Sequence, residues 1–486
     1  MNTDPAGVVA RLDRLPLRGP ILLLLVVGST SFFFDTADSV ALGLVAPTVR
    51  SVFGIELSTV AVIVALSYLA LFVGAYGGGW LADRWGRRPT LVLATVWSGL
   101  GGASAALSGD VVSFTALRCL GAVGIGALYV VTMVYLVEMS PHRHRGRIIA
   151  FAFTVSGVGV IAVTGFARWA VPLGAEGWRL IFCAALLGLA TIPFLLRLPE
   201  SPRWLLAQGR TKQAGTAIEW LERRFERRGT TLDEPVPTTE PPVVEEVRTR
   251  ELFGRRLRRP TLLGMLVIAS FTVISQLLTT WTPTLLDAKG FSTSDALSIA
   301  SLVVLGSLVG GGLATLLARR ASPKTTAVVC CLLGATVGMG FGFAAGFWVV
   351  VVFGFVHWIC LGVIAPVGNR IIAEQFPSQA RGRGTGMALS AGRLANVVAP
   401  FALALALASL GVTSVAWLFL AAWLLITAGV IGLVHRRRTR VATSDSAALA
   451  HDAPGGTTRA KTAWGRPSGR TDAGSPEPES GVADLA

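Results

Sequence analysis

Long apolar segments alternate with short polar loops along most of the chain. Each segment approaches or exceeds the about 20 residues that an α-helix needs to cross the hydrocarbon core of a bilayer. The segments cover residues 20–46, 58–79, 89–108, 111–137, 147–170, 178–197, 260–283, 296–318, 325–345, 347–371, 384–409 and 412–434. This pattern predicts an all-α membrane protein with twelve transmembrane helices in two groups of six.

Polar regions flank the two groups and set the expected domain boundaries. The central one contains an amphipathic helix that reaches Phe225, followed by a Pro- and Glu-containing linker at 230–246. The C-terminal one is rich in Gly, Ser, Pro and Ala without apolar periodicity, so we expect it to be disordered. The predicted parts are an N-terminal region at 1–19, a six-helix half at 20–197, a central loop at 198–259, a second six-helix half at 260–434 and a tail at 435–486.

The two groups of segments repeat each other. Glu138, followed by a proline and an Arg-Gly-Arg triplet, recurs 236 residues later (from 138 to 374) as Glu374 with the same companions. The same offset brings Gly54 onto Gly290. Parallel duplication of a six-helix half predicts a binding site near the membrane midplane, between the halves.

Composition and the placement of charge exclude two broad classes of protein. Of the 486 residues, 52% are hydrophobic and only 15% are charged, which excludes a water-soluble enzyme. The net charge is +15, but about 37 of the 43 Lys and Arg residues lie in the termini and in alternate loops. This positive-inside pattern predicts a plasma (inner) membrane protein with both termini cytoplasmic, and no nucleic-acid partner. The opposite loops hold Arg50, Arg168, Arg179 and Lys289.

Signals for catalysis or metal binding are missing from the sequence. There is no P-loop and no His-x-x-x-His pair, and the five cysteines have no ligand-like spacing. We therefore predict no enzymatic activity, no cofactor and no metal site.

The loop after the second segment carries a motif that combines glycines, an acid and several arginines. It reads GWLADRWGRR at residues 79–88. Arginines at a helix end would fit the positive-inside pattern, but that pattern does not explain the acid or the glycines. The motif closely resembles the loop signature of the major facilitator superfamily. The resemblance implies the fold of that family, with two six-helix halves related by a pseudo-twofold axis.

By this resemblance, the motif and the repeated Glu and Arg residues form a latch that must break when a central cavity opens inward. Asp83 can accept hydrogen bonds from a helix N-terminus and can pair with arginine. In the second half Thr315 replaces this acid, so the second copy should be weak. The expected latch residues are Gly79, Asp83, Arg84, Gly86, Arg87, Arg88, Glu138, Arg145, Glu374 and Arg381.

Shorter motifs divide the resemblance between branches of the superfamily. Residues 199–204 are similar to sugar porters, but the seventh segment lacks their paired glutamines and Asn369 stands where they carry a tryptophan. The similarity to metabolite and aromatic-acid:proton symporters rests on the acids Asp35 and Asp38, residues 280–283 and the Gly-Arg pair at 392–393. We favour this second branch. A sugar or polyol:proton symporter is the alternative, and a proton-driven efflux antiporter is a further one.

Ionisable residues inside apolar segments indicate functional sites, because each costs about 2.5–3.5 kcal/mol at a helix centre. Asp35 and Asp38 lie three residues apart on one helical face, so their repulsion favours a shared proton site. Arg118 of the fourth segment is the expected partner of one of them. Its depth favours Asp38, whereas the resemblance to sugar porters favours Asp35. We expect protonation of the acid pair to free Arg118 and permit the conformational switch. A purely structural pairing with Arg118 is the alternative to this role in proton coupling.

Arg393 is the candidate for recognising the substrate. It lies about 13 Å from the cytoplasmic end of the eleventh segment at 1.5 Å per residue, near the midplane. A substrate carboxylate would pair with its guanidinium. Pairing with a first-half acid or with backbone carbonyls is the alternative. Other candidates for substrate contact are Asn396, Gln276, Trp281, Tyr129 and His357. Their alternative roles are helix packing, interfacial anchoring or, for His357, a position in the core.

These features predict a secondary active transporter that takes up a small organic metabolite together with protons by alternating access. The expected substrate carries a carboxylate, as in an aromatic or other organic acid. The expected partners are this small molecule, protons and the lipid bilayer, and we expect the protein to be a monomer.

Overall fold

The computed structural model describes residues 5–16, 20–227, 232, 234, 249–376 and 378–451. These residues form helices and loops, and twelve of their helical segments are long and apolar enough to cross a membrane. The predicted all-α protein with twelve transmembrane helices is therefore confirmed. The spans are Gly28–Phe53, Leu57–Trp85, Arg87–Leu107, Val111–Glu138, Arg147–Leu173, Gly177–Leu195, Arg258–Thr279, Thr293–Leu317, Pro323–Phe343, Phe347–Ala373, Arg383–Leu410 and Ser414–Leu433.

Glycine sets the helix spacing in the first half. A Cβ atom added at Gly74 of α3 would lie 1.9 Å from the Val123 oxygen of α5, and one at Gly78 would lie 2.6 Å from Ala127 Cα. Small residues therefore allow α3 and α5 to touch along their backbones. The helices of this half are α2 (Pro20–Phe53), α3 (Leu57–Trp85), α4 (Arg87–Ser104), α5 (Val111–Glu138), α6 (Arg145–Ala170), α7 (Gly177–Cys183) and α8 (Ile192–Leu195), with 3-10 segments η1 (Ala105–Leu107), η2 (His142–His144), η3 (Val171–Leu173) and η4 (Ala184–Thr191).

The two halves agree at an aligned glycine and differ at an aligned proline. Gly54 and Gly290, which the repeat aligns, both follow a helix with positive φ, 59° and 88°. Helix α2 runs unbroken through Pro47, whereas the equivalent Pro283 lies in the first turn of a new short helix, where it needs no backbone donor. The helices are α11 (Arg258–Thr279), α12 (Thr282–Ala288), α13 (Thr293–Val303), α14 (Gly306–Arg320), α15 (Pro323–Phe343), α16 (Phe347–Ala373), α17 (Ser378–Leu410) and α18 (Ser414–His451), preceded by η5 (Thr249–Phe253).

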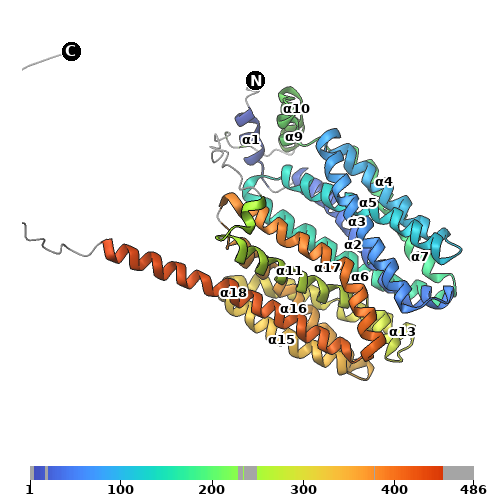
Figure 1. Cartoon of the computed structure of the whole chain (residues 1–486). Helices are drawn as coiled ribbons and strands as arrows, with labels where there is room; N and C mark the ends of the chain where they lie inside the picture. Colours follow the sequence, from blue (N-terminus) through green and yellow to red (C-terminus); the bar gives the residue numbers. More distant parts are fainter. Residues whose placement is uncertain are drawn as a thin grey trace, which may run out of the picture. The chain divides into compact units, whose positions relative to one another are not determined.

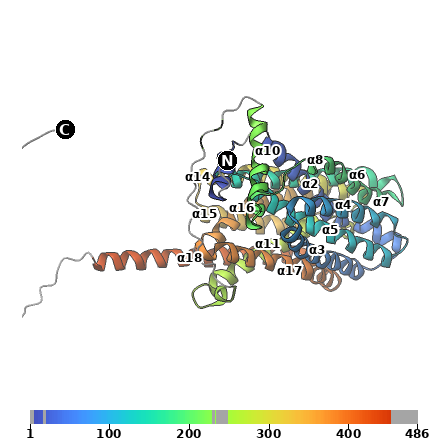
Figure 2. The same ribbon diagram turned by 90° about the horizontal axis from the view of Figure 1, so that it is seen from above.

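The contacts between the halves are made mainly by α3 with α17, by α6 with α13 and α14, and by α2 with α12 and α13. Figures 1 and 2 show the two groups of helices and the position of α17 beside α3 between them. A site shared by the halves therefore lies among these helices and those packed beside them, such as α5 beside α2 and α3, and α11 beside α17.

One end of the bundle carries the short helices α1 (Pro5–Asp13), α9 (Pro202–Ala207) and α10 (Thr211–Glu226), and we call it the cap end. The opposite end, where α2 ends and α3 begins, is called the distal end. The N-terminal region, for which the sequence predicted no helix, packs Val8, Leu12 and Leu15 against the apolar face of α10. The sequence signal was weak because only these few apolar residues interrupt a charged segment.

A buried acid fastens α1 to α10. Glu222 accepts hydrogen bonds from Arg14 at 2.6 Å and from Arg11 Nε at 3.1 Å, and Asp13 accepts from the His142 backbone amide at 2.8 Å. Burial alone would raise the pKa of Glu222, but the hydrogen bonds and charges of Arg11 and Arg14 outweigh it and lower the pKa. Arg11, Asp13 and Arg14 therefore tie the central loop to the loop before α6.

The C-terminal tail differs from the expectation of disorder over its first part. Helix α18 continues beyond the last span to His451, and residues 437–451 belong to a separate unit that starts at Arg437. The helix continues because no Gly or Pro follows Gly432 until Pro454. Residues 452–486, and most of the predicted linker at 230–246, lie outside the described residues.

Candidate functional site

Arg118 of α5 forms a buried ion pair with Asp38 of α2. Its Nη1 atom lies 2.6 Å from Asp38 Oδ2, and its Nη2 atom donates to the Asp38 backbone oxygen at 2.9 Å. The Arg118 side chain is 3% exposed, and its guanidinium lies 5.7 Å from the centroid of the Phe182 ring. Of the two partners left open by the sequence, the structure pairs Arg118 with Asp38. The pair ties α2 to α5 within the first half.

Asp35, Tyr129 and Arg393 meet where the two halves face each other. Arg393, on α17 of the second half, places its guanidinium carbon 5.6 Å from the centroid of the Tyr129 ring on α5. The buried Asp35 carboxyl on α2 lies within electrostatic reach of Arg393 and of Asp38. Tyr129 also contacts Phe32 edge-on, with 5.1 Å between ring centroids. A cation of the second half therefore faces an acid and a phenol of the first.

Gln276 of α11 makes a second contact between the halves. Tyr68 Oη, from α3, donates to Gln276 Oε1 at 2.7 Å, and Thr280 Oγ1 donates to the same oxygen at 3.0 Å. Beside them the backbones of the halves touch, since a Cβ atom at Gly43 would lie 2.4 Å from Thr280 Cα. Tyr68 was missed by the sequence analysis, because no spacing or motif relates the second span to the seventh.

Four of the predicted substrate-contact residues hold buried polar atoms without a hydrogen-bond partner among the described residues. These atoms are Gln276 Nε2, Trp281 Nε1, Asn396 Oδ1 and His357 Nδ1, the last of which lies apart in the second half. Gln276 and Trp281 line a cavity of about 190 Å³ between α11, α17 and α18, whose other walls are mainly aliphatic. Buried polar groups are nearly always satisfied in folded proteins, so unsatisfied ones are candidates for ligand or water contact.

His357 lies elsewhere, in the interior of the second half. Its Nε2 atom accepts a hydrogen bond from Trp423 Nε1 at 2.8 Å, and its ring packs 4.6 Å from the ring of Phe419. The side chain is fully buried between α16 and α18. The structure therefore does not bring His357 to the contact between the halves, and its environment is that of a core histidine.

At the cap end, the predicted latch centres on Arg87 at the start of α4. Its Nη2 and Nε atoms contact the two carboxylate oxygens of Glu138 at 2.9 and 3.0 Å, and its Nη1 atom lies 3.0 Å from Asp83. Nη1 also donates to the Ala82 backbone oxygen at 2.8 Å. A single guanidinium thus joins the ends of α3, α4 and α5.

Glu200 of the central loop completes this network, although the sequence analysis singled out only the stretch around it. Its carboxylate accepts from the backbone amides of Arg87 at 2.9 Å and Ser201 at 2.8 Å. Burial raises the pKa of Glu200, and the amides and the Arg87 charge oppose that rise. Gly86 is required here, because its φ is +107° and a Cβ atom would lie 2.3 Å from Glu200 Oε2. Trp204 of α9 donates to the Asp83 backbone oxygen at 2.9 Å.

The remaining latch residues are more dispersed. Arg84 lies 5.6 Å from the Trp80 ring, and Arg88 donates to the Leu196 backbone oxygen. Gly79, unlike Gly74 and Gly78, has room for a Cβ atom, whose nearest neighbour would be 3.8 Å away.

In the second half the latch copy is sparse. Glu374 pairs with Arg370 on its own helix at 2.9 Å, and Thr315 bonds back to the Gly311 oxygen of its own helix. Arg145 begins α6. The side chain of Arg381 lies outside the described part of the structure.

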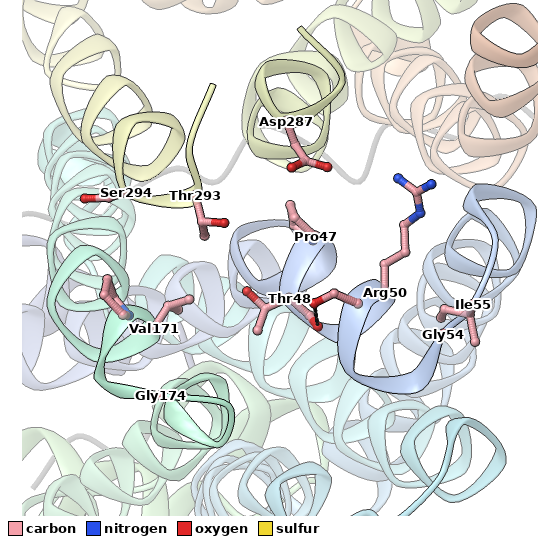
Figure 3. A pocket seen from close by; sticks show the side chains of 12 residues that line it. Pro47, Thr48, Arg50, Gly54, Ile55, Val171, Gly174, Asp287, Thr293 and Ser294 are labelled. Atoms are coloured by element: carbon pink, nitrogen blue, oxygen red, sulfur yellow. Dashed lines mark hydrogen bonds between the residues drawn. The ribbon is translucent and has the colours of Figure 1, made fainter. Parts of the chain in front are cut away.

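A hollow of about 620 Å³ opens at the distal end between the two halves (Figure 3). Thr48, Arg50 and Ser51 at the end of α2 line one side. Asp287, Thr293 and Ser294 line the other. This hollow was not anticipated from the sequence, because its walls come from segments of different halves that are far apart in the chain.

Metal binding is not indicated in the described residues, where no group of three or more His, Cys, Asp or Glu side chains could hold an ion.

Comparison with known proteins agrees with this architecture. A sequence model described as the Major Facilitator Superfamily matches residues 27–357 and 299–470. The putative metabolite transport protein YyaJ of Bacillus subtilis is 30% identical over 429 residues, covering 87% of this chain and 94% of that protein. The gallate transporter of Pseudomonas putida is 27% identical, covering 81% of this chain and 87% of that protein.

A crystal structure of a D-xylose-proton symporter superimposes with a TM-score of 0.67 at 19% identity, over 85% of this chain and 97% of that one. These matches cover most of the chain. The twelve spans in two repeated halves and the glycine-acid-arginine network at the cap end agree with them. The chain belongs to the major facilitator superfamily and is a multi-pass membrane transporter.

Proposed function

We propose that the protein takes up a small carboxylate-bearing organic acid together with protons. The observation that carries this proposal is the meeting of Asp35, Tyr129 and Arg393 between the halves. Arg393 is a cation from the second half that faces an acid of the first across the place where a family member binds its cargo.

Substrate binding is coupled to proton binding because Arg393 changes its anionic partner from Asp35 to the substrate. In this scheme the Arg393 guanidinium is the counter-ion of an ionised Asp35 carboxylate when no substrate is bound. A substrate carboxylate that binds Arg393 bidentately withdraws this counter-ion from Asp35. An ionised carboxylate left in a buried site beside Asp38 is costly, so Asp35 takes up a proton. Substrate and proton therefore bind together, and neither leaves a bare charge in the membrane.

Asp38 has a different role in this scheme from the one that the sequence suggested. Its carboxylate is held by Arg118 at 2.6 Å, and this pair keeps a fixed negative charge near Asp35. We infer that Asp35 carries the proton and that the Asp38–Arg118 pair positions α2 and adds to the repulsion. Release of Arg118 is not required for the step.

An aromatic acid is the substrate class best supported. The ring of Tyr129 beside Arg393 offers a surface for an aromatic ring, and Gln276 and Trp281 hold donors without a partner among the described residues. The gallate transporter, a relative of this chain, is named for an aromatic acid.

Alternating access moves the halves about this site. We propose that the cap end faces the cytoplasm, because the arginine-rich loops and both termini belong to that side by the positive-inside rule. The Arg87 network then stabilises the arrangement of α3, α4 and α5 at the cytoplasmic face, and the Gly43–Thr280 contact closes the outer path. The protein is proposed to act as a monomer in the plasma (inner) membrane.

Uptake into proteoliposomes that contain a pH-sensitive dye tests the proposal. Adding gallate outside should acidify the interior, and Arg393→Gln should abolish both gallate uptake and acidification. Arg168→Gln, which removes an exposed arginine outside the site, should change neither. Acidification by D-xylose but not by gallate would favour a sugar symporter. Alkalinisation on gallate entry would favour antiport, and gallate flux without proton movement would refute proton coupling.

A further inference from the structure

The distal hollow lies on the path that a substrate would follow to the central site. Arg50 is seven residues beyond Gly43 along α2, or about 10 Å at 1.5 Å per residue. Asp35 is eight residues on the other side of Gly43, or about 12 Å. The contact of Gly43 with Thr280 therefore separates the hollow from the Asp35–Arg393 region. A ligand that arrives at the distal end meets the hollow first.

The size and lining of the hollow suit a small organic acid. Its volume of about 620 Å³ lies within the usual range for ligand pockets. The side chains of Arg50 and Asp287 come from opposite halves, and Figure 3 shows both at the hollow, whose second-half side is also lined by Thr293 and Ser294. A molecule that carries both a carboxylate, to pair with Arg50, and a hydroxyl group, to donate to Asp287, would match this pair of charges.

Arg50 is the distal cation whose charge is available. Arg179 pairs with Glu176 and donates to the Ala106 oxygen, and Lys289 donates to the backbone oxygens of Phe341 and Ala344 at 2.8 and 3.0 Å. Arg168 is exposed and does not line the hollow. The Arg50 backbone oxygen accepts from the Ile55 amide at 3.1 Å, but its guanidinium forms no hydrogen bond or ion pair with the residues that the structure describes, and it stands at the rim of the hollow in Figure 3.

We propose that the distal hollow is a first binding site for a hydroxylated organic carboxylate, separate from the central site. Arg50 binds the carboxylate, and Asp287 accepts a hydrogen bond from a hydroxyl group of the same molecule. Asp287 also disfavours anions that lack such a donor. The choice of ligand class rests on the proposed function, whereas the existence of the site rests on the hollow itself.

Binding of gallate to the purified full chain in lipid nanodiscs tests this site separately from the central one. In the Arg393→Gln protein, the hollow should still bind one gallate, and adding Arg50→Gln should remove this binding. Arg50→Lys should keep the charge but bind about tenfold more weakly, because the bidentate geometry is lost. Arg168→Gln is the matched control and should leave both sites intact. Elution volume and melting temperature should show that each variant is folded.

Salt gives an independent readout. The hollow is open to solvent, so its gallate binding should weaken between 0.1 and 1 M salt, as the Debye length falls from about 10 to about 3 Å. Absence of gallate binding in the Arg393→Gln protein, or binding that Arg50→Gln leaves unchanged, would overturn the distal site. Unchanged binding stoichiometry in the Arg393→Gln protein compared with the unmodified chain would instead count against the proposed central site.

Discussion

Replacing Asp38 with asparagine leaves the Arg118 guanidinium inside the first half without the carboxylate that it contacts in the structure. The pair joins α2 to α5, and both side chains are under 10% exposed. Removing one partner of a buried ion pair costs about 3–5 kcal/mol, because the remaining charge loses its compensation. The asparagine oxygen can still accept from Arg118, so we expect the lower part of this range.

A loss of about 3 kcal/mol corresponds to about a hundredfold change in the unfolding equilibrium constant. The double variant Asp38→Asn with Arg118→Met removes both charges, and most of the lost stability should return, because uncharged packing replaces the pair. Glu176→Gln serves as the matched control. It breaks a pair whose acid is 68% exposed, for which about 0–1 kcal/mol is expected.

Unfolding in dodecyl sulfate mixed micelles, followed by far-ultraviolet circular dichroism, measures these differences. If Asp38→Asn is as stable as the unmodified chain but no longer accumulates substrate, the pair is a transport group rather than a structural one. If the double variant is no more stable than Asp38→Asn, the argument from an uncompensated charge is wrong.

Three further predictions follow from contacts outside the central site. Gly86→Ala should lower the free energy of unfolding by about 1–3 kcal/mol, because residue 86 has a backbone conformation that only glycine tolerates. Gly77→Ala is the control and should cause no such loss, because open space surrounds Gly77. Equal melting temperatures of the two variants would contradict this prediction. Arg11→Ala with Arg14→Ala should increase amide exchange in α1. The ionised Glu222 carboxylate makes the pairs with Arg11 and Arg14, and these pairs lower its pKa below the ordinary value of 4.5. In the unmodified chain, α1 should therefore be released from α10 only when the pH falls through this lowered pKa and Glu222 is protonated. Burial lowers the pKa of Lys289 to about 8, so its acylation by an amine reagent, read by mass spectrometry, should rise with a midpoint near pH 8; no reaction below pH 10 would refute this.

The spans were predictable because each depends on local composition. Twenty or so consecutive apolar residues leave no alternative to a membrane helix, and the repeat offset correctly aligned the positive-φ residues Gly54 and Gly290. The end of α18 was not predictable in the same way. Disorder was inferred from composition, yet no helix breaker stops the last span before Pro454.

The contacts between separate helices were harder to predict. Depth along a helix gives the height of a side chain but not its rotation relative to a neighbour, so Arg118 could not be assigned to Asp35 or Asp38 from the sequence. Tyr68 and Glu200 carry no motif of their own that points to Gln276 or to the start of α4. Such partners require the packing of the whole bundle.

Proton uptake on substrate binding tests the central claim most directly. Gallate added to the purified protein in weak buffer with a pH indicator should draw about one proton from solution for each molecule bound at the central site. The reason is that Arg393 then pairs with the gallate carboxylate, and Asp35, which loses this counter-ion, takes up a proton. Asp35→Asn should bind gallate without this uptake. Binding of gallate with no proton uptake by the unmodified protein, or equal uptake by Asp35→Asn, would contradict the charge exchange between Asp35 and Arg393.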